Sequence, residues 1–206
     1  MPKQVDHALR RRQIAEAVWR IARRGGLEAA SLSEVAAEAG VSKGLVQHYF
    51  RTREQILVFA SQALQERIEQ RVRRSIAAEA RQGSPHAVLR AILRGLLPTD
   101  RDSRTEMVVA SAFFIRALTD PALAARYRDG QVLILTALSD LVRQAQAAGE
   151  LLPDLDPARE AEVLLSVVES AGSALLLGRH SGASAMALLD HQLARLAPAR
   201  AGRRRR

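Results

Sequence analysis

Cysteine is absent from the 206-residue sequence, which excludes a disulfide framework and a thiolate-bound metal site. Aromatic residues are scarce at 3%, although hydrophobic residues reach 48%, so the core must be built mainly from aliphatic side chains. Abundant alanine, leucine and arginine favour helices, and no stretch alternates long enough with the period of two that marks a strand. The composition therefore predicts an all-α protein.

Long apolar runs and enzyme motifs are missing as well. No apolar run reaches the ~18 residues of a membrane helix, and the N-terminus has no apolar signal region, so we expect a cytoplasmic protein with no membrane partner. The five histidines show no His-Glu-x-x-His spacing, and neither a P-loop nor a dinucleotide-binding glycine pattern occurs. We expect no enzymatic activity, no cofactor and no metal site.

Positive charge is concentrated at the two ends of the sequence. Residues 1–53 hold ten Lys or Arg and five Asp or Glu, and residues 200–206 hold five Arg and no acid. Residues 54–199 are almost balanced, with 16 basic and 17 acidic side chains, although the net charge of the chain is +9. This distribution is typical of a protein with one end facing a polyanion. It predicts a basic arm before the first helix and a basic, disordered tail.

Residues 31–50 have the pattern of two short helices joined by a tight turn. Ser31 and Glu34 have the spacing of a capping box, which predicts a first helix that ends at Gly40. Ser42 can cap the second helix. Two short helices about a glycine-containing turn indicate a helix-turn-helix motif.

The second helix of such a motif enters the major groove, and its first turn meets the base edges. Gly44 removes a side chain where helix and bases approach most closely, and Gln47 can pair bidentately with adenine. Lys43, His48 and Tyr49 suit contacts with phosphate. A small helical corner with no nucleic-acid role is the alternative interpretation. The candidate DNA contacts are Ser31, Ser33, Ser42, Lys43, Gly44, Gln47, His48, Tyr49 and Arg53.

The segment from about Arg11 to Leu57 resembles the DNA-binding domain of TetR-family transcriptional regulators. The resemblance rests on Gly-Val-Ser-Lys-Gly at 40–44, the pair Tyr49-Phe50 and residues 53–57. Most of the family ends the recognition helix with tyrosine, any residue, histidine and phenylalanine. Residues 47–50 read Gln-His-Tyr-Phe instead, which is similar to the BetI-type subgroup. By this resemblance, Arg53 takes the place of a basic residue that contacts phosphate.

Cap and proline signals predict six further helices, at about 52–76, 86–97, 103–119, 121–148, 157–178 and 183–196. Two of them open at further capping-box spacings, Thr52 with Gln55 and Ser103 with Glu106. With the three helices of the N-terminal domain, the total is about nine. The predicted boundaries are 1–53 for the arm and helix-turn-helix domain, 54–198 for an effector-binding and dimerisation domain, and 199–206 for the tail.

The C-terminal two-thirds resembles the regulatory domain of the BetI-type subgroup, in particular at Leu97-Pro98, Phe113-Phe114, 120–124, 148–150 and 154–157. The resemblance implies an effector pocket inside the helical bundle and a dimer built on the last two long helices. Residues 163–177 agree, because they are apolar on more than one face and must bury against more than their own bundle. A buried helix in a monomer is the alternative.

Candidate pocket residues are fewer and less specific. Glu169 is the most suggestive, because an acid inside an apolar helix must be paired, exposed or facing a ligand. The scarcity of aromatic residues argues against the aromatic cage that a choline-like cation needs. For each candidate, core packing or a salt bridge is the competing role. The full set is Glu106, Phe113, Phe114, Arg116, Tyr127, Gln131 and Glu169.

These observations predict a homodimeric, TetR-type transcriptional regulator with double-stranded DNA as its partner. We expect a repressor that binds a palindromic operator and is released by a small-molecule effector. A transcriptional activator and a non-specific basic DNA-binding protein of the same fold are the alternatives. An enzyme built on a helical bundle is a third possibility, in which turnover would survive the loss of residues 1–53.

Overall fold

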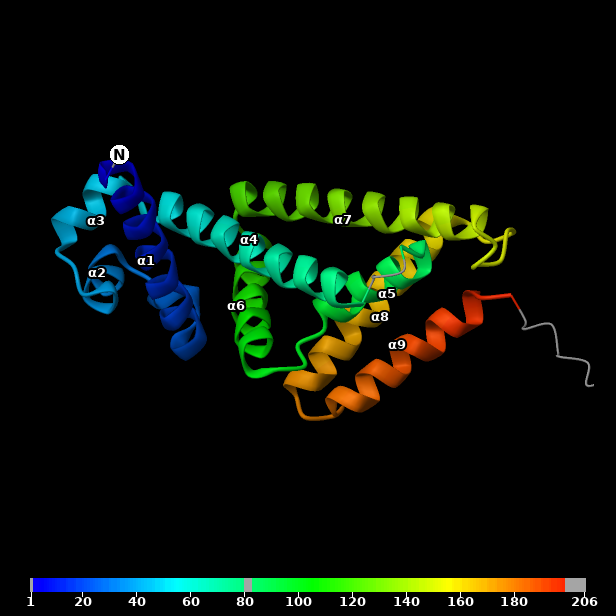
Figure 1. Ribbon diagram of the computed structural model, residues 1–206. Helices are drawn as coiled ribbons and strands as arrows, with labels where there is room; N and C mark the ends of the chain where they lie inside the picture. Colours follow the sequence, from blue (N-terminus) through cyan, green and yellow to red (C-terminus); the bar gives the residue numbers. More distant parts are fainter. Residues whose placement is uncertain (1, 80–82, 199–206) are drawn as a thin grey trace, which may run out of the picture. The chain divides into compact units, whose positions relative to one another are not determined.

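The computed structural model describes residues 2–79 and 83–198, and the predicted basic tail lies outside them. The regular structure of these residues consists of nine α-helices and one short 3-10 helix, with no strand (Figure 1). The all-α prediction is therefore confirmed. The helices are α1 (Pro2–Gly25), η1 (Leu27–Ala29), α2 (Leu32–Ala39), α3 (Lys43–Tyr49), α4 (Arg53–Glu79), α5 (Pro85–Leu96), α6 (Arg101–Ala117), α7 (Pro121–Ala147), α8 (Pro157–Leu176) and α9 (Gly182–Leu196).

Two helix starts differ from the sequence predictions. Helix α1 begins at Pro2, so the basic residues predicted to form an arm belong to the helix itself. Proline suits the first turn of a helix, and the residues that follow are mostly good helix formers. The prediction that α6 opens at Ser103 was wrong. Asp100 is its N-cap and accepts a hydrogen bond from the Ser103 amide at 2.8 Å, while the Ser103 hydroxyl accepts one from the Asp100 amide at 3.1 Å.

The chain forms two compact units. Unit 1 contains the described residues of 1–69 together with 100–129, and unit 2 contains those of 70–99 together with 130–198. Helices α4 and α7 each contribute residues to both units. These units divide the chain at other places than after residue 53, and the predicted domain boundaries stay a prediction.

Unit 1 surrounds one side of α1 with aliphatic side chains. Residues at helical spacing on α1 are buried and contact buried residues of α2, α3, α4 and α6. Trp19 covers the edge of this core, and its indole Nε1 donates a hydrogen bond to the Ala60 carbonyl at 3.0 Å. The core includes Ile14, Val18, Ile21, Val35, Val46, Phe50, Ile56, Leu57, Val109 and Phe113.

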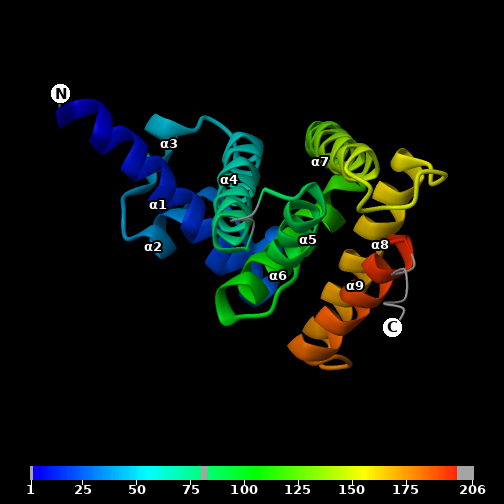
Figure 2. The same cartoon turned by 45° about the vertical axis from the view of Figure 1, so that its right-hand side comes forward.

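Unit 2 packs α5, α8 and α9 around a second aliphatic core. Leucines such as Leu89, Leu164 and Leu193 are almost fully buried in it. Figure 2 shows α8 and α9 lying side by side, and their shared core extends to α5. Arg90 of α5 donates two hydrogen bonds to the Asp190 carboxylate of α9, at 2.6 and 3.0 Å, and this pairing lowers the pKa of Asp190.

Candidate nucleic-acid interface

The α2–turn–α3 segment of unit 1 has the predicted caps (Figure 1). The Ser31 hydroxyl accepts a hydrogen bond from the Glu34 amide at 3.1 Å, and the Ser42 hydroxyl accepts one from the Leu45 amide at 3.1 Å. Gly40 ends α2 with φ 66° and ψ 34°, the left-handed conformation that glycine adopts without strain. The helix ends that flank the turn are therefore set by local hydrogen bonds.

Helix α3 has one buried face and one exposed face. Val46 is fully buried and Phe50, just beyond the helix, is 2% exposed, whereas Lys43, Gln47 and His48 are exposed. Apart from its two chain neighbours and the backbone of its own helix, no protein atom lies within 4 Å of the position that a Cβ on Gly44 would take. Packing within the protein therefore does not require glycine at 44, and the first turn of α3 is open to a partner.

A ring cluster joins α1 to the end of α3. The rings of His7 and Tyr49 have centroids 5.4 Å apart, those of His48 and Tyr49 5.3 Å, and those of His7 and His48 6.4 Å. His7 is exposed and lies beside two candidate DNA contacts, so the N-terminal part of α1 adjoins the same surface. The sequence pattern did not single out His7, because no local spacing links it to residues some forty positions away.

Arg53 is held by the protein itself. Its Nε donates to the Ala30 carbonyl at 2.9 Å, its Nη2 donates to the Leu27 carbonyl at 2.6 Å, and Nη2 lies 3.6 Å from a Glu28 carboxylate oxygen. The guanidinium therefore ties the start of α4 to the chain between α1 and α2. Of the other candidate DNA contacts, Ser33 is exposed in the first turn of α2.

Five of the effector candidates belong to unit 1, and two of these are internal. Glu106 is 5% exposed and accepts a hydrogen bond from Arg67 Nε at 2.6 Å, while Phe113 lies in the core. Phe114 and Tyr127 are 46% and 42% exposed, and their ring centroids are 5.4 Å apart. The structure therefore brings two exposed aromatic rings together. It pairs Glu106 with Arg67 and packs Phe113 in the core of unit 1.

The other three effector candidates have different surroundings. Arg116, in unit 1, donates from Nη1 to Glu28 at 3.2 Å and lies 3.6 Å from Asp120. Gln131 and Glu169 belong to unit 2, and both are exposed. Partial desolvation on α8 raises the pKa of the Glu169 carboxyl above its ordinary value. The pocket role of all seven candidates stays a prediction.

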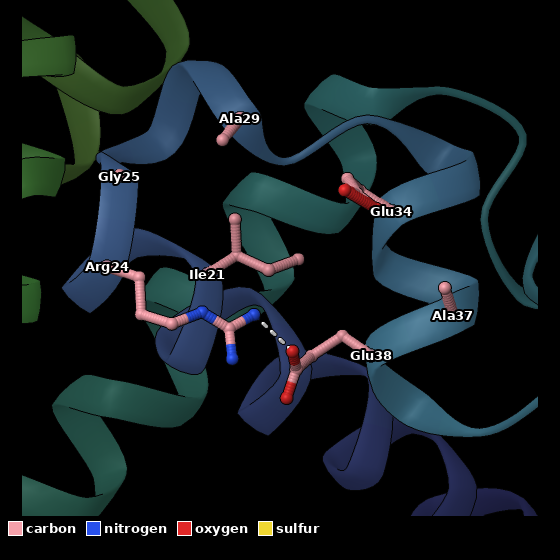
Figure 3. A pocket seen from close by; sticks show the side chains of 7 residues that line it. All are labelled: Ile21, Arg24, Gly25, Ala29, Glu34, Ala37 and Glu38. Carbon is pink, nitrogen blue, oxygen red and sulfur yellow. Dashed lines mark hydrogen bonds and ion pairs between the residues drawn. The ribbon is translucent and has the colours of Figure 1, made fainter.

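A hollow of about 430 Å³ lies between the end of α1, η1 and α2 (Figure 3). Arg24 and Glu38 form an ion pair beside it, and Glu38 also accepts a hydrogen bond from Arg20 Nε at 2.5 Å. The Arg20 hydrogen bond, followed by that of Arg24, lowers the pKa of Glu38. The carboxylate therefore fastens α2 to α1 and stays ionised.

The described residues form neither a metal-binding cluster nor a membrane-spanning helix. Within 2–79 and 83–198, no cluster of three or more His, Asp or Glu side chains could hold a metal ion. Over the same part of the chain, no helix is both long enough and apolar enough to cross a membrane.

Comparison with known protein families assigns this architecture. Residues 14–58 match the model for bacterial regulatory proteins of the tetR family, and residues 85–198 match the model for the C-terminal part of BetI-type transcriptional repressors. The chain therefore belongs to the TetR family of helix-turn-helix transcriptional regulators. Within that family, its C-terminal region is of the BetI type, as the resemblance predicted.

Individual relatives agree with this assignment. The chain is 36% identical over 169 residues to the HTH-type transcriptional regulator PksA of Bacillus subtilis, covering 82% of this chain and 80% of the relative. It is 31% identical over 158 residues to the regulator BetI of Escherichia coli, covering 72% and 79%. The crystal structure of a Rhodococcus transcriptional regulator, 31% identical, superposes with a TM-score of 0.77 over 90% of this chain and 95% of that one.

Proposed function

We propose that this protein is a cytoplasmic transcriptional repressor that binds a palindromic operator as a homodimer. The observation that carries the proposal is the capped α3 with its open first turn, in which Lys43, Gly44 and Gln47 face outward while Val46 is buried. Two such helices related by a two-fold axis would read half-sites whose centres lie ~34–36 Å apart. All the relatives described above are named as regulators, which supports regulation without catalysis.

The proposed dimer uses the outward faces of α8 and α9. The apolar side chains Val163, Leu177 and Leu188 are 39%, 74% and 40% exposed there. A second copy of the chain would cover them in an isologous interface, in which each subunit contributes the same patch. The BetI-type match of residues 85–198 supports this arrangement.

The proposed regulation is release of the operator by a small molecule bound in the C-terminal region. A regulator of this fold from Saccharomonospora viridis, 21% identical, was crystallised with choline, and AibR, 23% identical, with isovaleryl coenzyme A and operator DNA. For this chain, the effector must bind the released state better than the DNA-bound state. The difference between the two affinities sets how far the effector can shift the equilibrium towards the released state.

Fluorescence anisotropy tests the proposal. The protein is titrated against labelled duplexes from the DNA upstream of its own gene and against a scrambled duplex, at two salt concentrations, and an operator is selected from random sequence in parallel. We expect selective binding at two protomers or a multiple per site. Equal binding to every duplex, with no sequence enriched by the selection, would overturn the repressor proposal in favour of a non-specific DNA-binding protein.

A further inference from the structure

Two arginines that the sequence assigns to different sites share one carboxylate. Arg53, a candidate DNA contact, has its Nη2 3.6 Å from Glu28 Oε2. Arg116, a candidate effector contact at the end of α6, donates from Nη1 to Glu28 Oε1 at 3.2 Å. Each guanidinium uses a different oxygen of Glu28, so both pairs exist at the same time. All three residues belong to unit 1.

Each arginine also has a second attachment. Arg53 donates to the carbonyls of Leu27 and Ala30, which flank α2 on its N-terminal side. Arg116 Nε lies 3.6 Å from Asp120, and Asp120 caps α7 by accepting hydrogen bonds from the Ala122 and Leu123 amides at 3.1 and 3.2 Å. Glu28 is therefore the link between the α1–α2 connection and the α6–α7 connection.

Among Arg53, Glu28 and Arg116, the glutamate is the residue whose replacement should most disturb the charge balance. The side chains of Arg53 and Arg116 are 23% and 26% exposed, whereas that of Glu28 is 76% exposed. Removing the carboxylate would take away the anion that both guanidiniums contact, and would leave them Asp120 beside Arg116 and the coulombic attraction of Glu54. Both arginines keep other partners, and η1 and α6 share the apolar core of unit 1, so the local fold would persist while the ionic link between η1 and α6 would be lost.

We propose that Glu28 is a positioning residue for operator binding, through which Arg116 of α6 holds the helix-turn-helix in the orientation that the operator requires. The inference rests on the proposed function. An event that moves Arg116 away from η1 breaks its pair with Glu28 and so loosens the helix-turn-helix. A less restrained helix-turn-helix binds one half-site as before but meets two half-sites in register less often. Operator affinity is therefore sensitive to α6, although α6 lies outside the helix-turn-helix.

The test compares Glu28→Gln, Arg116→Gln and the double variant with the wild type. Anisotropy is measured on the selected operator and on a random duplex. We expect each single variant to bind the operator about two- to five-fold more weakly, the range that an exposed ion pair supports. Glu28→Gln removes a negative charge, so its random-duplex binding should be unchanged or slightly tighter. The double variant should lose less operator affinity than the sum of the two single losses, because both changes break the same Glu28–Arg116 pair.

Matched controls separate positioning from misfolding. Arg143→Gln breaks an exposed ion pair with Asp140 in unit 2, at 2.6 Å, and should bind the operator like the wild type. Trp19 is the only tryptophan and lies in unit 1, so its fluorescence during denaturation checks that unit in each variant. Wild-type protein without selectivity would overturn the proposed function and this inference with it. A selective wild type with unchanged single variants, or additive losses in the double variant, would overturn the inference alone.

Discussion

The helix-turn-helix and the set of effector candidates differ in the range of their side-chain interactions, which are local in the first and long-range in the second. Around α3, the hydroxyls of Ser31 and Ser42 are used within their own caps, and Lys43, Gln47 and His48 face outward. Among the effector candidates, Glu106 and Arg116 form pairs with residues from distant parts of the sequence. Local pattern therefore predicts the caps of α2 and α3, whereas the role of a charged residue in the helical body depends on long-range packing.

The largest expected effect contrasts the two aromatic environments. Phe50 is 2% exposed and its ring centroid lies 5.3 Å from that of Phe59, whereas Phe114 is 46% exposed. Phe50→Ala should lower the free energy of unfolding by ~3–5 kcal/mol, because it leaves a cavity in the core of unit 1. Phe114→Ala should cost ~1 kcal/mol or less. Guanidinium titrations followed by Trp19 fluorescence measure both, and equal costs would contradict the assignment of Phe114 as a surface ring.

The same contrast explains how much of the fold and of the interface the sequence predicts. The caps at Ser31 and Ser42 were correctly predicted, because each joins a hydroxyl to an amide three residues ahead. The start of α6 was misplaced because Ser103 and Glu106 have the spacing of a capping box. The actual box pairs Asp100 with Ser103, and Asp100 has no Glu three residues later.

The partners of charged residues were not predictable from the same patterns. Arg53 bonds to carbonyls 23 and 26 residues earlier, and Glu106 bonds to Arg67, 39 residues earlier. No sequence period connects such positions. The short helix η1, which carries Glu28, also had no signal beyond the two glycines before it. Glu28 was therefore absent from the predicted site, although it bridges two of the predicted residues.

A second prediction concerns base reading by α3. Gln47 is exposed on α3, one turn beyond Gly44, and its amide can pair bidentately with adenine. Gln47→Ala should reduce the discrimination between operator and random duplex by ~1–3 kcal/mol while leaving random-duplex binding nearly unchanged. Anisotropy titrations on both duplexes measure the difference. Equal losses on the two duplexes would remove Gln47 from the base-reading role.

A third prediction separates two basic residues that the sequence treats alike. Lys43 is exposed, so Lys43→Ala should weaken operator and random DNA together and reduce the salt slope by about one. Arg53 is bonded to Leu27 and Ala30, so Arg53→Ala should instead lower the free energy of unfolding by ~1–2 kcal/mol. It should change the salt slope less than Lys43→Ala. Salt titrations and denaturant unfolding of both variants provide the comparison, and an equal fall in slope would restore Arg53 as a phosphate contact.

The smallest effect concerns Glu169 of α8, whose carboxyl is partly desolvated. Desolvation raises the folded-state pKa of Glu169, so the unfolded state releases this proton at lower pH than the folded state does. Its contribution to stability is therefore fully present below the unfolded pKa and is lost as pH rises through the folded pKa. Glu169→Gln should raise the melting temperature slightly at neutral pH and leave it unchanged near pH 3.

The control for this last variant is Glu162→Gln, which removes an exposed acid from the same helix. Melting curves at pH 3 and pH 7 for both variants and the wild type isolate the desolvation of Glu169 from the loss of one negative charge on α8. If Glu169→Gln instead melts lower at pH 7, the carboxylate has a stabilising partner in the assembled protein. On the proposed α8–α9 interface, that partner would belong to a second copy of the chain. The side-chain interactions of the helical region would then include contacts between two subunits, and the contrast with the exposed face of α3 would have to be revised.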